Sequence, residues 1–178
     1  MLLVKTTVRH PQALRRDAYR DAARASDRQQ VVLVMNDVLA QTLNLSLQAR
    51  RLRWHATGSS FAASREMLRQ MATDLDSYSD LAAQRAVLLG GVVDAHFDGR
   101  QGDYAKSPQG VAEHRPSMTA ALGLLTLAVS AAAALARHEM HALAALGDPV
   151  SEHLLEEVAS GLDKWTWCLE VHLQGLAD

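Results

Sequence analysis

The sequence contains very little cysteine, proline or aromatic side chain. Of 178 residues, one is Cys, four are Pro and 4% are Phe, Trp or Tyr. A single thiol, Cys168, cannot close an intrachain disulfide, and zinc or iron–sulfur sites built on thiolates need several cysteines. We therefore expect Cys168 to fill space in the core.

Long apolar runs are also missing. No uninterrupted apolar stretch reaches the roughly 18 residues that a membrane-spanning helix needs. The apolar start, Met1–Val4, is too short for a secretory signal, and Lys5 and Arg9 follow it instead of preceding it. The apolar content of 48% is nevertheless too high for a disordered chain. We expect one domain with a sizeable core, in the cytoplasm and without membrane contact.

The signatures of several common enzyme classes are absent. The chain carries no glycine-rich phosphate loop, no nucleophile elbow and no Cys/His dyad, so hydrolase and nucleotide-dependent functions have no support. Its formal net charge of −2 excludes a protein that coats nucleic acid through its overall charge. Any contact with nucleic acid must come from a local basic segment.

The chain does contain a strong helical pattern. Apolar residues recur at spacings of three and four, which predicts helices packed side by side at shallow angles. The four stripes span Met35–Leu52, Leu68–Leu89, Met118–Ala136 and Leu155–His172. Arg85 is the one charged member of the second stripe. No segment alternates with a period of two, so no strand is required.

The helix ends are marked by residues that favour caps. Gly90 and Gly91 suit the C-terminal cap of the second helix, and the third helix ends at Gly147. Asp148 is the expected N-cap of the fourth helix, with Pro149 at the first helical position.

The connections predict the topology. The first and last pairs of helices are joined by a few residues each, so each pair forms an antiparallel hairpin. The stretch from about Gly90 to Pro116 is polar, broken by glycine and proline, and long enough to cross a whole bundle. The predicted fold class is therefore all-α, a ferritin-like four-helix bundle with a long crossover between its second and third helices. Residues 29–178 form this bundle.

Residues 1–28 are expected to form a basic N-terminal tail or a short helix. They carry seven basic and three acidic residues, a net charge of +4 in a chain of net charge −2. The candidate DNA contacts are Lys5, Arg9, Arg15, Arg16, Arg20 and Arg24. The alternative is a surface helix that docks on the bundle through Leu14 and Tyr19.

Three segments then resemble a known family in order and spacing. They read RLRWHATGSSFAASREMLRQM, DLAAQRAVLLGG and LDKWTWCLEVHLQ, and they are similar to the Dps-type mini-ferritins, the DNA-protection-during-starvation family. The resemblance implies a hollow shell of twelve identical four-helix subunits. It also implies oxidation of Fe(II), usually with hydrogen peroxide, storage of the iron mineral inside the shell and, in many members, binding of DNA through basic tails.

The ferroxidase site implied by this resemblance lies between two subunits and is largely replaced here. The family histidine before the tryptophan corresponds to Arg53, and a histidine and a carboxylate early in the second helix correspond to Arg65 and Arg69. From the facing subunit, the family aspartate is matched by Asp80 and the glutamate by Gln84. A guanidinium is cationic and has no lone pair to donate, so these arginines should repel Fe(II).

We therefore hypothesise that the ferroxidase site is lost. Arg65 and Arg69 are four residues apart, as are Asp80 and Gln84, so the two pairs can meet across the subunit interface as an arginine–carboxylate bridge. The excess positive charge would suit phosphate or another anion, which leaves an anion-binding structural homologue as one alternative. The plainer interpretation is that these arginines are solvated residues on a helix face.

A second alternative keeps an active ferroxidase, with iron bound by other ligands or in mixed shells with a family-type subunit. The candidate iron ligands are His138 and His141, three residues apart, and His153 with Glu156. His55, which follows Trp54 directly, is a further candidate ligand. The resemblance places Asp148 and Glu152 near a threefold pore that admits iron.

Three further positions on the fourth helix are expected to serve packing. Trp165 and Trp167 match aromatic positions of the family, and His172 lies on the apolar stripe with one ring nitrogen expected to be hydrogen-bonded.

Overall fold

The computed structural model describes residues 25–56, 62–94 and 117–176. These residues form four α-helices and no strand. In chain order the helices are α2 (Ala25–His55), α3 (Ala62–Leu88), α4 (Met118–Ala145) and α5 (Pro149–Gly175). The candidate DNA contacts at positions 5–24 lie outside the described residues. Helix α2 begins at Ala25, so the last residues of the expected tail range are helical.

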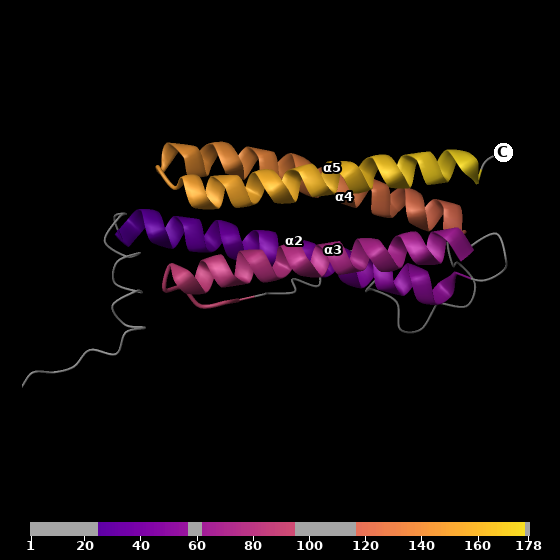
Figure 1. Ribbon diagram of the computed structural model, residues 1–178, viewed down its shortest axis with the longest axis horizontal. Helices are drawn as coiled ribbons and strands as arrows, with labels where there is room; N and C mark the ends of the chain where they lie inside the picture. Colours follow the sequence, from indigo (N-terminus) through magenta and orange to yellow (C-terminus); the bar gives the residue numbers. More distant parts are fainter. Residues whose placement is uncertain (1–24, 57–61, 95–116, 177–178) are drawn as a thin grey trace, which may run out of the picture.

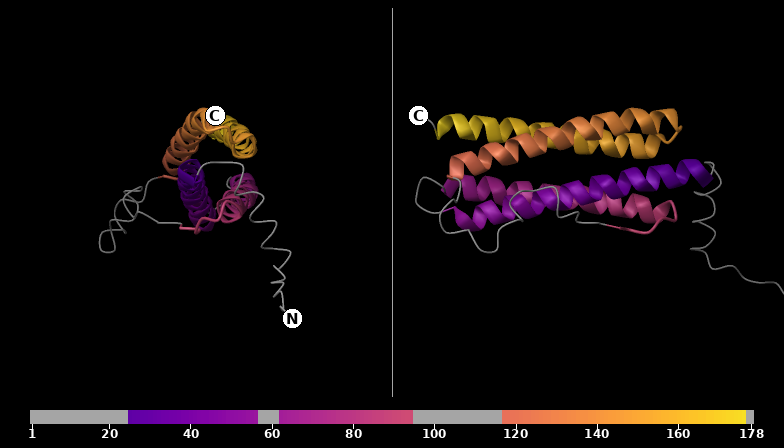
Figure 2. Two further views of the ribbon diagram at one scale, coloured as in Figure 1. Left: turned by 90° about the vertical axis from the view of Figure 1, so that its left-hand side faces the viewer. Right: turned by 180° about the vertical axis from the view of Figure 1, so that it is seen from behind.

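The helices pack as two hairpins laid against each other. In Figures 1 and 2, α2 lies beside α3 and α4 beside α5, and the two pairs form two layers with their axes nearly aligned. The end of α3 and the start of α4 lie at opposite ends of the molecule, as a long crossover between the second and third helices requires. This arrangement confirms the predicted all-α, ferritin-like bundle.

The predicted stripes form the core between the layers. Met35, Leu75, Leu125 and Leu162 are almost completely buried, one from each helix, and most other stripe members are buried with them. Each large apolar side chain removed from water contributes about 1.5–3 kcal/mol. The interlocked stripes are therefore what holds the four helices at this spacing.

The predicted helix ends are confirmed. Gly90 and Gly147 adopt positive φ angles of 84° and 71°, which explains glycine at both C-terminal ends. The side chain of Asp148 accepts a hydrogen bond from the backbone N–H of Ser151, and Pro149 begins α5.

Helix α4 corrects one expectation. It contains an 18-residue window with a mean hydropathy of 2.0, which is long and apolar enough to cross a membrane by length and composition alone. Counting uninterrupted apolar runs missed this window, because Thr, Gly and Ser break the run without adding charge. The core helix of a bundle passes the same test, and α4 packs against α5 and α2 here.

Residues expected to fill the core behave differently from one another. Trp165 is buried, and its indole N–H donates to the Asp74 carboxylate at 3.2 Å. The expectation of packing is wrong for Trp167, whose side chain is 64% exposed because its position lies on the outer side of α5. Cys168 is half-buried and packs against the core. His172 is also half-buried, and its Nε2 lies 2.5 Å from the Ser64 hydroxyl, as the stripe pattern predicted.

Candidate functional site

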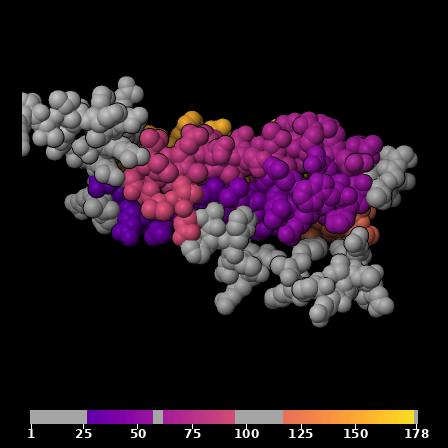
Figure 3. Space-filling view, turned by 90° about the horizontal axis from the view of Figure 1, so that it is seen from below, coloured from indigo at the N-terminus to yellow at the C-terminus, as the bar shows by residue number. Residues whose placement is uncertain are grey.

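The three arginines predicted to replace iron ligands lie at one end of the α2–α3 layer. Arg53 is in the last turn of α2, and Arg65 and Arg69 are in the first two turns of α3, which runs in the opposite direction. Figure 3 shows the face that these two helices build together. Arg65 and Arg69 are exposed and Arg53 is half-buried, so their guanidinium groups remain accessible to solvent.

Arg69 is held by a carboxylate on its own helix. Its Nε lies 2.9 and 3.1 Å from the two oxygens of Glu66, and its Nη2 lies 2.5 Å from Oε1. Hydrogen bonding from Arg69 lowers the pKa of Glu66; desolvation opposes this, and the charges of Arg69 and Arg53 add to the lowering. The same hydrogen bond raises the pKa of Arg69. Glu66 therefore stays ionised and forms an ion pair with Arg69.

The other two arginines differ from Arg69 in their contacts. Neither Arg53 nor Arg65 makes a hydrogen bond or ion pair with any residue in the described part of the chain. The charge of Arg53 acts on Glu66, and Arg65 lies one helical turn before Arg69 on α3. The result is a basic cluster, consisting of Arg53, Arg65 and Arg69, in which N–H donors outnumber acceptors.

Asp80 and Gln84 lie on the same face of α3 but far from the basic cluster. Eleven residues separate Arg69 from Asp80, which corresponds to about 16 Å along a helix. Both side chains are exposed, and neither makes a hydrogen bond or ion pair with another described residue. A single chain therefore does not bring the five family positions together.

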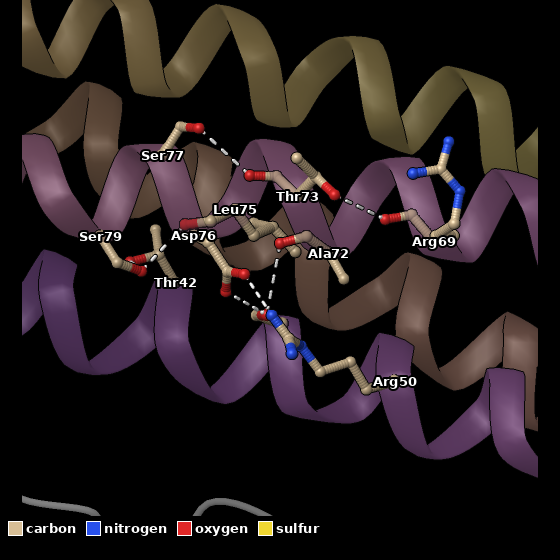
Figure 4. Close-up of polar contacts among 10 residues, drawn as sticks. Thr42, Arg50, Arg69, Ala72, Thr73, Leu75, Asp76, Ser77 and Ser79 are labelled. Carbon is tan, nitrogen blue, oxygen red and sulfur yellow. Dashed lines mark hydrogen bonds and ion pairs between the residues drawn. The ribbon is translucent and has the colours of Figure 1, made fainter.

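Polar contacts between α2 and α3 fix the position of the basic cluster. Arg50 of α2 pairs with Asp76 of α3, and the Ser46 hydroxyl donates to the same carboxylate at 2.6 Å. One turn away, the hydroxyls of Thr42 and Ser79 are hydrogen-bonded at 2.8 Å. Figure 4 shows Arg50 reaching from α2 to α3, whereas the guanidinium of Arg69 lies clear of α2.

Sequence reasoning missed these contacts. The available signal was the spacing of Thr42, Ser46 and Arg50, which places three polar residues four apart on one side of a helix.

The alternative iron ligands are spread over exposed helix surfaces. His138 and His141 are exposed on α4. His153 is 81% exposed, and its Nδ1 lies 3.3 Å from a Glu156 oxygen. Within residues 25–56, 62–94 and 117–176, no group of three or more His, Cys, Asp or Glu side chains is arranged to hold a metal ion. His55 is exposed at the end of α2.

Of the two expected pore residues, Asp148 is already engaged. Its carboxylate accepts two hydrogen bonds from Arg85, at 2.8 and 2.9 Å, and two from the backbone and hydroxyl of Ser151. Burial alone raises the pKa of Asp148, but the hydrogen bonds from Ser151 and Arg85 outweigh it and the pKa lies below its ordinary value. Glu152 is half-buried at the same helix start.

The sequence matches the model of the ferritin-like domain over residues 33–177, which includes most of α2 and all of α3, α4 and α5. The chain belongs to the ferritin-like family. Among curated proteins it is 26% identical over 149 residues to the DNA protection during starvation protein of Agrobacterium fabrum, covering 81% of this chain and 88% of the relative.

Solved structures agree with this assignment. DpsC from Streptomyces coelicolor is 25% identical with a TM-score of 0.72, and the match covers 85% of this chain and 88% of DpsC. Dps from Microbacterium arborescens, in its high iron form, is 22% identical with a TM-score of 0.71, covering 85% and 97% of the two chains. This ferritin-like protein is thus of the Dps type, as its motifs predicted.

Proposed function

We propose that this protein is a subunit of a Dps-like shell whose intersubunit ferroxidase site does not bind Fe(II). The observation that carries the proposal is the basic cluster: three of the five family ligand positions hold guanidinium groups, and one of these is paired with Glu66. The relation to the Agrobacterium protein supports a role in DNA protection, and iron is the ion to test because a structural neighbour, the Microbacterium protein, is known in a high iron form.

The residues present do not fit Fe(II). An iron site needs anionic oxygens and neutral imidazoles. Of the five positions only Asp80 offers an anionic oxygen, Gln84 is neutral, and the nearby Glu66 is occupied by Arg69. Guanidinium groups cannot be deprotonated at neutral pH to free a lone pair. The charge of the basic cluster opposes the approach of a dication.

The same residues fit a contact between two copies of the chain. An antiparallel pair of α3 helices that aligns Arg69 with Asp80 of a second copy also aligns Arg65 with Gln84, because both pairs have a spacing of four residues. Each bridge would combine charge with the fork geometry of arginine. This contact is the first step towards the homo-oligomer, a dodecamer, that we propose.

Apolar side chains beside the proposed contact support an interface. Leu33, Val92 and Val93 are exposed near one end of the α2–α3 layer, and Trp54 is 63% exposed near the other end. In an antiparallel pair, each end of the layer in one copy lies beside the opposite end of the layer in the other copy. Such contacts would remove large apolar groups from water at the rim of the arginine bridges.

Binding of DNA is assigned to the basic tail. Twelve tails on one shell multiply a weak electrostatic contact through their effective concentration. We accordingly propose a cytoplasmic protein that associates with the nucleoid when its tail binds DNA.

A mixed shell is the second candidate function. It is favoured by Asp80, the one family ligand that is retained, which is exposed and makes no hydrogen bond within the described residues. A family-type subunit that supplies histidines across the interface could use Asp80 as one oxygen ligand. The test is co-expression with such a subunit, because the site is shared between copies.

The first experiment follows Fe(II) oxidation by absorbance on metal-free protein, with peroxide and then oxygen, after native mass spectrometry has established the assembly. We expect a shell that oxidises Fe(II) no faster than buffer does. Fast oxidation that saturates at a fixed iron content per subunit would overturn the lost-site proposal and make His138, His141, His153 and Glu156 the first positions to mutate.

A further inference from the structure

The basic cluster has the chemistry of an anion site. Arg65 and Arg69 lie one helical turn apart, and Arg53 approaches the same place from α2, close enough for its charge to act on Glu66. Each guanidinium presents five N–H donors and no acceptor. The family pattern has metal ligands, which offer lone pairs, at these positions. In this chain the same positions hold hydrogen-bond donors, which suit an anion instead of a cation.

The cluster also has spare capacity for a ligand. Glu66 takes three hydrogen bonds from Arg69 alone, while Arg53 and Arg65 make none with the described residues. Across the proposed interface, Asp80 of a second copy would neutralise one further charge and the Gln84 amide would add two N–H donors. Three guanidinium groups against two carboxylates leave a net charge of +1 at each site.

We propose that the basic cluster binds a small tetrahedral oxyanion, with phosphate as the ligand class. Paired guanidinium groups match the oxygen spacing of phosphate, and charge-assisted hydrogen bonds hold it more tightly than a halide. The inference rests on the proposed function, because it names the ligand of the site from which iron is excluded. A phosphodiester of DNA has the same chemistry, but the site lies on the face assigned to subunit contact, so free phosphate is the occupant.

Phosphate binding is tested by isothermal titration calorimetry on the full-length, metal-free protein with inorganic phosphate, in chloride buffers of constant ionic strength. The variant R53Q/R65Q removes two guanidinium groups that hold no other described residue, so its fold is expected to be retained. We expect saturable binding by the native protein and a loss of about tenfold or more in the variant, since hydrogen bonds to charged groups are removed.

The matched control is R51Q/R137Q, which removes the same charge from exposed sites outside the cluster. Its dissociation constant for phosphate should lie within about twofold of that of the native protein. Fluorescence of Trp54, which neighbours Arg53 and is exposed, supplies a second readout, and this signal should vanish in W54F. The proposal would be overturned if both double variants lost the same affinity for phosphate. It would also be overturned if the heat of binding varied only with ionic strength.

Two further measurements on the same samples separate this inference from the proposed function. If the protein neither binds phosphate nor oxidises Fe(II), the anion site is overturned and the lost-site proposal remains intact. Rapid Fe(II) oxidation overturns the lost-site proposal, whether or not phosphate binds. A duplex oligonucleotide distinguishes the source of the phosphate group. If R53Q/R65Q weakens duplex binding while inorganic phosphate does not bind, the basic cluster binds the phosphodiester backbone of nucleic acid and the proposal fails.

Discussion

Arg85 of α3 and Asp148 at the start of α5 form a buried ion pair between residues 63 positions apart. The Arg85 side chain is 7% exposed, and its Nε also donates to the Ser151 hydroxyl at 2.8 Å. The pair ties the end of the α2–α3 hairpin to the turn between α4 and α5. It therefore joins the two layers where the apolar core ends.

Removal of Arg85 should be strongly destabilising. In R85M the Asp148 carboxylate, which is only 13% exposed, loses its cation, and we expect a loss of about 3 kcal/mol in the free energy of unfolding. Urea denaturation followed by circular dichroism measures the change. The control R137M breaks the pair with Asp163, which is about half exposed, and should cost less than about 1 kcal/mol. Similar losses in the two variants would contradict a special role for the buried pair.

The depressed pKa of Asp148 predicts a dependence of stability on pH. Because the folded protein holds this carboxyl below its ordinary pKa of 3.8, the ionised form stabilises the fold above that pH and the contribution is lost as the pH falls through the folded pKa. We expect D148N to be less stable than the native protein at neutral pH, with the gap narrowing below about pH 4. Urea midpoints at several pH values test this, and a constant gap would contradict it.

Gly161 and Gly123 should respond oppositely to substitution by alanine. A Cβ at Gly161 would overlap the ring and hydroxyl of Tyr78, whereas nothing lies within 4 Å of the position that a Cβ would take at Gly123. We expect G161A to lose about 1–3 kcal/mol of stability and G123A to gain about 0.5–1 kcal/mol from its higher helix propensity. Thermal melts compare the two. Partial rescue of G161A by Y78F would identify the hydroxyl contact as the cause.

Restoring the family ligands should create an iron site. In R53H/R65H/R69D/Q84E, imidazoles and carboxylates replace guanidinium groups around the retained Asp80, which gives Fe(II) the ligands that it prefers. We expect Fe(II) oxidation with peroxide to rise by about tenfold or more over the native protein. The control R53Q/R65Q/R69Q/Q84E removes the same arginines without adding imidazole. Equal rates in the two folded, assembled variants would show that these positions do not form the site.

Deletion of residues 1–24 should weaken DNA binding. It removes Lys5, Arg9, Arg15, Arg16, Arg20 and Arg24, so fewer phosphates are neutralised and both affinity and its dependence on salt decrease. Gel-shift titrations at two salt concentrations measure both quantities. If the deletion instead lowers the melting temperature and leaves DNA binding unchanged, the segment is a docked surface helix.

The sequence alone determined the helices and their ends. Periodic apolar residues and caps act within a few residues along the chain, so stripes such as Leu68–Leu89 and ends such as Gly90 and Asp148 could be assigned without a structure. Arg53, Arg65 and Arg69 were equally visible, and their inability to donate a lone pair is a property of the residue itself.

Only the tertiary structure decided which polar groups meet. Arg85 and Asp148, and likewise Trp165 and Asp74, are separated by 63 and 91 residues, and nothing in the local spacing indicates these pairs. Trp167 faces outward although Trp165, two residues earlier, is buried. Such contacts depend on how two hairpins are rotated against each other, which is decided by the packing of the whole core.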